Sequence, residues 1–172
     1  GTSGKNLPTV ILVHGGPTSR DYWGYRADVQ LLASRGYAVL QVNFRGSWGY
    51  GKNFTTAGFK QWGKKMQDDI TDGATWLVDQ GVADKDKIAI FGSSYGGYSA
   101  LAGVTFTPDV YACGIAYVGP SNLFTLLNNL PSYWEPEKEM LFEMIGHPVA
   151  DSVLLYNASP VFHTENIKVP LF

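Results

Sequence analysis

The sequence is poor in charge, and this shortage excludes several classes of protein. Charged residues make up 16% of the 172 positions and hydrophobic residues 45%, which is a globular rather than a disordered composition. The 13 Lys and Arg residues nearly balance the 15 Asp and Glu residues, giving a formal net charge of −2, and basic residues form no block. We therefore expect no nucleic-acid partner and no binding to an anionic membrane.

Cysteine and long hydrophobic runs are also scarce. The single cysteine, Cys113, excludes an internal disulfide and a cysteine-rich metal site, and neither a metal nor a cofactor is expected. Because Cys113 lies in the apolar run YACGIAYVG, we expect a buried structural thiol rather than a nucleophile. No apolar run approaches the ~20 residues of a membrane span. The opening GTSGKNLPTV has no signal-peptide pattern, which leaves the compartment open.

Glycine, in contrast, is abundant, with 20 copies, and it forms clusters at residues 15–16, 46–51 and 92–97, each directly after an apolar run. Four such runs predict buried strands, at residues 9–14, 37–44, 87–92 and 111–119. Helical patterns lie between them, at residues 26–35, 68–80 and 94–105. This alternation predicts an α/β fold, a mostly parallel sheet with helices on both faces. Sites in such sheets lie at the carboxyl ends of the strands, where the glycines cluster.

Two further features concern the ends of these elements. Asp68 and Asp69 open the second predicted helix, where the helix dipole favours negative charge. Residues 120–148, with four prolines and the pair Tyr133-Trp134, predict an irregular lid or pocket wall followed by one or two short helices. We call residues 120–148 the lid segment.

The stretch GSSYGGY (92–98) places Ser94 between Gly92 and Gly96. A serine hydroxyl becomes a nucleophile when it projects from a strained strand-to-helix turn beside a base. Glycines two residues away on each side leave room for that turn, and here it lies between a predicted strand and a predicted helix. Ser94 is therefore the candidate nucleophile. The competing interpretation is a structural glycine-rich bend.

Two other glycine clusters border the same edge of the sheet. In HGGP (14–17), Gly15 and Gly16 let the backbone approach a substrate closely, and we expect His14 to hold the loop by hydrogen bonds rather than to act as the base.

In NFRGSWGYG (43–51), the Tyr50 hydroxyl either donates to an oxyanion or simply fills a surface groove. Arg45 either binds a substrate oxygen or pairs with Asp68 or Asp69, and we favour the pairing.

HGGP, NFRGSWGYG and GSSYGGY, in this order and spacing, resemble the prolyl oligopeptidase family of serine peptidases, which has an α/β-hydrolase fold. The later stretches VGPSNL, IGHP and ASPVFHTENIKVPLF are most similar to its acylaminoacyl-peptidase branch. The resemblance implies no cofactor and a peptide as the substrate.

The resemblance also implies roles for individual residues. Ser94 matches the nucleophile, the backbone N–H of Tyr95 the first oxyanion donor, and the hydroxyl of Tyr50 the second. The region of Leu123, Leu126 and Trp134 matches the wall of the pocket for the residue before the scissile bond. Ser93 stands where the family commonly has a bulkier residue.

The family's catalytic aspartate and histidine have no counterpart in the sequence, since they follow a strand that KVPLF (168–172) would begin. His147 and His163 are not expected to replace them. We therefore expect residues 1–172 to be part of a catalytic domain that is incomplete on its C-terminal side, without the family's N-terminal β-propeller, and nearly inactive alone. An unpaired sheet edge is expected to let such a fragment self-associate as a homo-oligomer.

The first functional hypothesis is a serine peptidase that hydrolyses short or N-acylated peptides. The second keeps the chemistry but changes the substrate, as in a carboxylesterase or lipase-like enzyme. The third is a hydrolase-fold module without catalysis that binds a partner.

Overall fold

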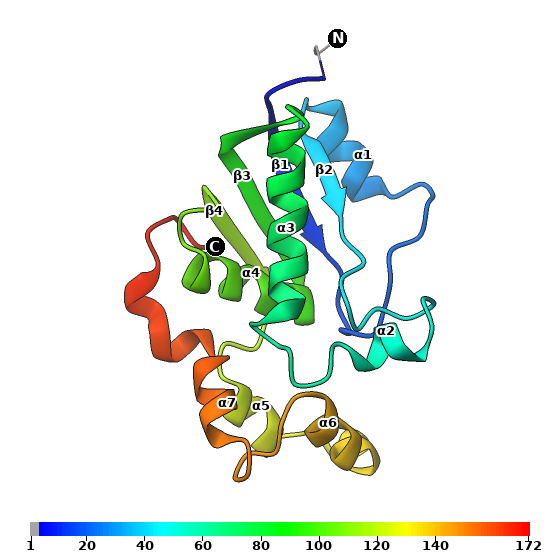
Figure 1. Ribbon diagram of the computed structural model, residues 1–172, viewed down its shortest axis with the longest axis vertical. Coiled ribbons are helices and arrows are strands. Elements are labelled where there is room, and N and C mark those ends of the chain that lie inside the picture. Colours follow the sequence, from blue (N-terminus) through cyan, green and yellow to red (C-terminus); the bar gives the residue numbers. More distant parts are fainter. Residues whose placement is uncertain (1–3) are drawn as a thin grey trace.

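Four parallel strands form the centre of the molecule in a computed structural model that describes residues 4–172 (Figure 1). Their order across the sheet is β2-β1-β3-β4. The strands are β1 (Leu7–Val13), β2 (Ala38–Gln41), β3 (Ala83–Ser93) and β4 (Cys113–Tyr117). The chain thus crosses over between parallel neighbours, as the alternating pattern predicts.

The middle strand β1 is buried on both faces of the sheet. Ile11 pairs in register with Leu40 of β2 and Ile90 of β3, and it belongs to the main hydrophobic core. Val10 and Leu12 alternate with it onto the opposite face and are also buried. This double burial explains why the strand reads as a continuous apolar run.

The helices connect the strands and cover the sheet. They are α1 (Ala27–Ser34), α2 (Lys52–Thr56), α3 (Lys65–Asp79), α4 (Tyr95–Phe106), α5 (Leu123–Asn128), α6 (Lys138–Met144) and α7 (Ser152–Asn157), with 3₁₀ helices η1 (Ser132–Glu137) and η2 (Pro160–Asn166). Helix α3 crosses in front of the sheet in Figure 1 and packs on α4, while α1 packs on β2. The predicted parallel sheet covered by helices is confirmed.

Several element boundaries differ from the sequence prediction; strand β3, for example, begins at Ala83 rather than at residue 87. Strand β2 ends at Gln41, before the glycine-rich loop rather than inside it. Helix α3 begins at Lys65, three residues before Asp68, because Met66 is fully buried and anchors the first turn by packing.

Cys113 is half-buried in β4 and is free, so the expected buried thiol is partly accessible.

The lid segment contains more helix than its prolines suggested. It forms α5, η1 and α6, which lie below the carboxyl ends of the strands in Figure 1. Helix α5 begins there because the Asn122 side chain accepts hydrogen bonds from the Phe124 and Thr125 N–H groups. The lid segment therefore adjoins the edge of the sheet where the glycine clusters lie.

The last residues run beside the outer strand β4. The N–H of Gly114 donates to the Pro170 carbonyl at 3.0 Å, and the N–H of Phe172 donates to the Gly114 carbonyl at 2.9 Å. A parallel bridge joins Gly114 to Leu171, so KVPLF does pair as the start of a further strand. Self-association through a sheet edge remains a prediction.

The described residues, 4–172, contain neither a membrane-spanning helix nor a cluster of metal ligands. None of their helices is long and apolar enough to cross a membrane. Among the same residues, no three His, Cys, Asp or Glu side chains gather as metal ligands.

Candidate active site

Ser94 lies at the sharp turn between β3 and α4. Its backbone has φ 57° and ψ −118°, a left-handed φ that a residue with a side chain rarely adopts. The turn is held on both sides: the Ser94 N–H donates to the Tyr117 carbonyl at 3.0 Å, and the Ser94 carbonyl accepts from the Tyr98 N–H at 2.9 Å. The Ser94 side chain is exposed at the carboxyl end of the sheet, as a nucleophile elbow requires.

The positions of Gly92, Gly96 and Gly97 around Ser94 have no room for a side chain. A Cβ on Gly92 would overlap the backbone of Gly96, and one on Gly96 would overlap the Val13 carbonyl. A Cβ on Gly97 would come within 2.7 Å of the Tyr117 carbonyl oxygen. The strand, turn and helix thus approach each other at backbone distance, which fixes the direction of Ser94.

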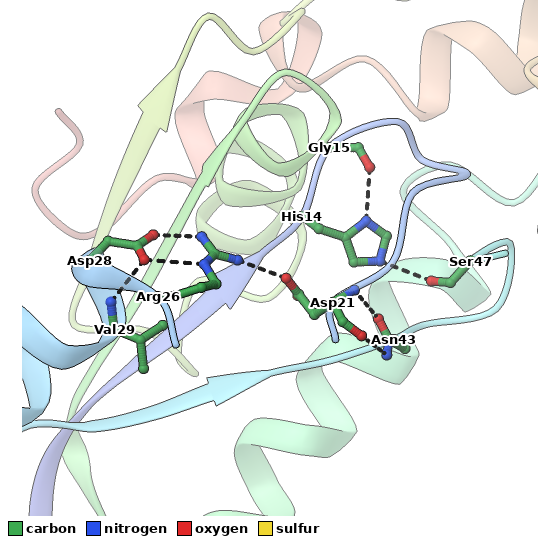
Figure 2. Close-up of polar contacts among 8 residues, drawn as sticks. All are labelled: His14, Gly15, Asp21, Arg26, Asp28, Val29, Asn43 and Ser47. Carbon is green, nitrogen blue, oxygen red and sulfur yellow. Dashed lines mark hydrogen bonds and ion pairs between the residues drawn. The ribbon is translucent and has the colours of Figure 1, made fainter. Parts of the chain in front are cut away.

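The HGGP loop packs directly against this turn. A Cβ on Gly15 would lie 3.3 Å from the Ser93 carbonyl oxygen and 3.6 Å from the Ser94 Cβ. His14 ties the loop down: its Nδ1 lies 2.8 Å from the Gly15 carbonyl oxygen and its Nε2 lies 2.9 Å from the Ser47 hydroxyl (Figure 2). His14 therefore holds the loop, as expected, with both ring nitrogens engaged.

The surroundings of His14 favour its neutral form. Its ring stacks on Phe44 with centroids 4.4 Å apart. Burial lowers the pKa of His14 below its ordinary value, against a smaller opposite effect of the hydrogen bond to Gly15.

The backbone N–H of Tyr95 lies at the turn beside Ser94, whereas its side chain is buried in the core. As the first residue of α4, its N–H belongs to the first turn, where the helix offers no carbonyl four residues back. Its ring packs against Phe44, Trp62 and Tyr98 and is 1% exposed. Burial raises the pKa of the Tyr95 phenol far above its ordinary value, so the hydroxyl stays protonated.

Tyr50 lies in the glycine-rich loop after β2, is 48% exposed and is not among the residues that line the cavity beside Ser94. Its hydroxyl oxygen accepts hydrogen bonds from Asn43 Nδ2 at 2.8 Å and from Arg20 Nη2 at 3.4 Å. The ring also contacts Phe54. Tyr50 is thus a fixed group rather than a loose surface aromatic.

Arg45, in the same loop, makes the structural ion pair that was favoured. Its Nε and Nη2 donate to the two carboxylate oxygens of Asp69 at 2.8 and 2.6 Å, and its backbone N–H donates to the same carboxylate. This bidentate pair joins the loop after β2 to α3 and commits Nε and Nη2 of Arg45 to a structural role.

A cavity of about 590 Å³ opens beside Ser94. Its lining is mostly apolar, with three tryptophans. The lining residues used below are Gly16, Trp48, Leu126, Trp134, Glu137 and Met140. Gly16, Leu126 and Trp134 were predicted here. The prediction for Leu123 was wrong, because Leu123 lies on the face of α5 that packs into the core and is 0% exposed.

Several residues of the site escaped sequence reasoning. Trp48, Glu137 and Met140 line the cavity, and Asn43 and Arg20 hold Tyr50. Only Trp48 had a signal, as an aromatic inside a recognised glycine cluster. Arg20 reaches Tyr50 from a loop 30 residues away along the chain, which no local pattern reports, whereas Asn43 lies seven residues before Tyr50 in the same loop.

The other two histidines are engaged elsewhere. His147 Nδ1 accepts from the N–H groups of Val149 and Ala150, and His163 contacts the Tyr156 carbonyl and the Phe106 ring. Neither belongs to the lining of the cavity at Ser94.

A parallel sheet with helices and a serine on a strained strand-to-helix turn define the α/β serine hydrolases. The sequence pattern of the prolyl oligopeptidase family matches residues 23–172. The chain belongs to that family of serine peptidases, and the expected α/β-hydrolase fold is confirmed.

Proteins similar to this chain include several kinds of peptidase. Dipeptidyl aminopeptidase BIII of Pseudoxanthomonas mexicana is 51% identical over 99% of this chain and 25% of its own length. A puromycin-hydrolysing peptidase of Mycobacterium tuberculosis superposes with a TM-score of 0.91 at 34% identity, over 99% of this chain and 25% of its own. Acylaminoacyl peptidase of Pyrococcus horikoshii superposes with a TM-score of 0.85 at 30% identity, over 97% and 27%. The chain thus spans about a quarter of the length of these proteins.

Proposed function

We propose that the intact protein is a serine peptidase that hydrolyses short peptides, free or N-acylated, with Ser94 as its nucleophile. The observation that carries the proposal is the position of Ser94, on a strained turn whose glycines admit no side chain, at the mouth of an apolar cavity. A structural glycine-rich bend gives no reason for the exposed left-handed serine.

The reaction follows from the groups around Ser94. Its Oγ attacks the scissile carbonyl carbon and gives its proton to a base, while the carbonyl oxygen becomes an oxyanion. The Tyr95 N–H and the Tyr50 hydroxyl donate to that oxyanion. When the C–N bond breaks, the base returns the proton to the leaving amine, and water then hydrolyses the acyl-enzyme.

The proposal assigns the base to a histidine, oriented by an aspartate, that follows residue 172 in the intact protein. His14 is excluded from this role by its two hydrogen bonds and its place beneath the loop. His14 also precedes Ser94 in the chain, whereas the base of this fold follows the serine, in the order serine, aspartate, histidine.

The cavity supports an apolar residue on the acyl side of the scissile bond. Leu126, Trp134 and Met140 give it walls suited to a large apolar side chain. Because a 51% identical relative is a dipeptidyl aminopeptidase, we extend the proposal to release of dipeptides from a free amino terminus. Release of an N-acylated residue is the alternative that the acylaminoacyl peptidases favour.

Three substrates that share the same apolar residue test the proposal with the intact protein: a free-amine dipeptidyl anilide, an N-acetyl-aminoacyl anilide and an aryl ester. Anilide turnover that disappears in Ser94→Ala is expected. The preferred anilide distinguishes dipeptide release from acylated-residue release. Ester turnover without anilide turnover would overturn the peptidase assignment in favour of an esterase.

A further inference from the structure

The hydroxyl of Tyr50 is held by two side chains that reach it from different parts of the chain. Asn43 follows β2, and Arg20 lies in the loop after HGGP. Both side chains contact the Tyr50 hydroxyl oxygen. The donors and acceptors around this oxygen therefore determine where the hydroxyl proton can point.

The orientation of the Asn43 amide is fixed by Asp21. The backbone N–H of Asp21 donates to Asn43 Oδ1 at 2.8 Å, and Asn43 Nδ2 donates to the Asp21 carbonyl at 3.0 Å (Figure 2). A backbone N–H can only donate, so the amide oxygen must face it. The NH₂ group of Asn43 therefore faces Tyr50, and its second proton goes to the phenol oxygen at 2.8 Å.

Asp21 is itself anchored. Its carboxylate accepts from Arg26 Nη1 at 2.7 Å, and Arg26 also pairs with Asp28 at the start of α1 (Figure 2). The amide of Asn43 is thus part of a network that reaches the first helix, and it cannot rotate without breaking two backbone hydrogen bonds.

Arg20 approaches the same oxygen from a second direction. Its guanidinium carbon lies 4.6 Å from the Tyr22 ring centroid and 4.5 Å from that of Tyr50, so both rings contact the cation. Gly49 leaves the room for it: its φ is +87°, and a Cβ there would overlap Arg20 Nη1. A guanidinium has no acceptor, so Arg20 also can only donate to the phenol oxygen.

A phenol oxygen has two lone pairs and one proton. Since Asn43 and Arg20 both donate to it, the proton has no acceptor on either of them and must point elsewhere. We infer that Asn43 and Arg20 are positioning residues that reserve the single proton of Tyr50 for the oxyanion of the substrate. This inference rests on the proposed function, in which Tyr50 is the second oxyanion donor.

Asn43→Asp gives the sharpest test, because a carboxylate of the same shape would accept the Tyr50 proton instead of donating to its oxygen. In the intact protein we expect kcat to fall to within about threefold of Tyr50→Phe, which loses ~10²–10³-fold as one oxyanion donor. KM should change much less than kcat. Asn53→Asp, an exposed asparagine on α2, is the matched control and should leave kcat unchanged.

Combining the variants separates positioning from a general structural effect. If Asn43 acts through the Tyr50 hydroxyl, adding Asn43→Asp to Tyr50→Phe changes kcat less than threefold. Arg20→Met, which keeps an apolar stem, should lower kcat in the wild type and leave it unchanged in Tyr50→Phe. It provides the same test if Asn43→Asp fails to fold.

Two outcomes would overturn the inference in different ways. If Tyr50→Phe loses ~10²-fold but Asn43→Asp and Arg20→Met keep wild-type kcat, the positioning role is wrong and the oxyanion assignment stands. If Tyr50→Phe keeps wild-type kcat while Ser94→Ala is inactive, Tyr50 is not a donor, and both that part of the proposed function and the inference fail.

Discussion

Gly96 faces the carbonyl oxygen of Val13 so closely that no side chain fits between them. This approach joins α4 to β1 and thereby sets the height of the turn that carries Ser94. Gly96→Ala should destabilise the protein by more than the ~1–3 kcal/mol of ordinary overpacking, because the obstacle is backbone. It should also lower kcat/KM by displacing Ser94.

Gly24→Ala is the matched control for this substitution. A Cβ on Gly24 would meet nothing within 4 Å, so thermal stability and kcat/KM should stay at wild-type values. The melting temperature and kcat/KM of the two variants can be compared in parallel. Wild-type values for Gly96→Ala would contradict the packing at this turn.

Tyr95 is expected to serve catalysis through its backbone alone. Its buried hydroxyl has no hydrogen-bond partner among the described residues, so Tyr95→Phe should raise the free energy of unfolding by up to ~1–3 kcal/mol. The kcat of Tyr95→Phe should stay within twofold of wild type. A loss of kcat comparable to that of Tyr50→Phe would show that the hydroxyl is used.

Tyr98→Phe provides the contrast for Tyr95→Phe. The buried Tyr98 hydroxyl donates to the Ala158 carbonyl at 2.7 Å, so its removal leaves that acceptor unsatisfied. We expect the melting temperature to fall in Tyr98→Phe and to hold or rise in Tyr95→Phe. The same shift in both variants would contradict the difference in hydrogen bonding.

Glu137 should influence which charges the cavity accepts. It is the one carboxylate among the cavity-lining residues described, and its negative charge disfavours an acidic side chain there. Because Glu137 is exposed, the effect should be modest, about two- to fivefold. Glu137→Gln is expected to raise kcat/KM for substrates with an acidic residue before the scissile bond.

Glu139→Gln, in the exposed first turn of α6 and outside the cavity lining, removes the same charge nearby and is the matched control. It should leave the ratio of kcat/KM for acidic and neutral substrates unchanged. Equal effects of the two variants would mean that a general surface potential, not Glu137, sets the preference.

His14 should make stability depend on pH. Burial lowers its folded-state pKa, so between that value and about 6.5 the unfolded chain binds more protons at this site than the folded protein does. The contribution of neutral His14 is therefore fully present above about pH 6.5 and is lost as the pH falls through the folded-state pKa. The melting temperature should fall more steeply on acidification in wild type than in His14→Asn. Parallel slopes would contradict a buried neutral His14.

The parts of the site that depend on residues close together in the chain could be predicted from the sequence. Ser94, Gly92 and Gly96 are neighbours in the chain, and their spacing follows from the steric needs of one turn. The pairing of Arg45 with an acid of α3 was also predictable, since a loop arginine after β2 and a following acidic helix lie close together.

Side-chain direction in the lid segment was not predictable in this way. In the short helix α5, Leu123 and Leu127 share the face that packs into the core, while Leu126 points to the cavity. The face of α5 that is buried depends on packing against α6 and α7, so the sequence of α5 alone does not determine which leucines are buried.

The most direct test of the central claim is labelling of the intact protein by a fluorophosphonate, with the modified residue located by peptide mass spectrometry. The account predicts stoichiometric labelling at Ser94, lost in Ser94→Ala and kept in Ser93→Ala, which changes the exposed serine next to it. No labelling of the wild-type protein, or labelling that survives in Ser94→Ala, would contradict the assignment of Ser94 as the nucleophile.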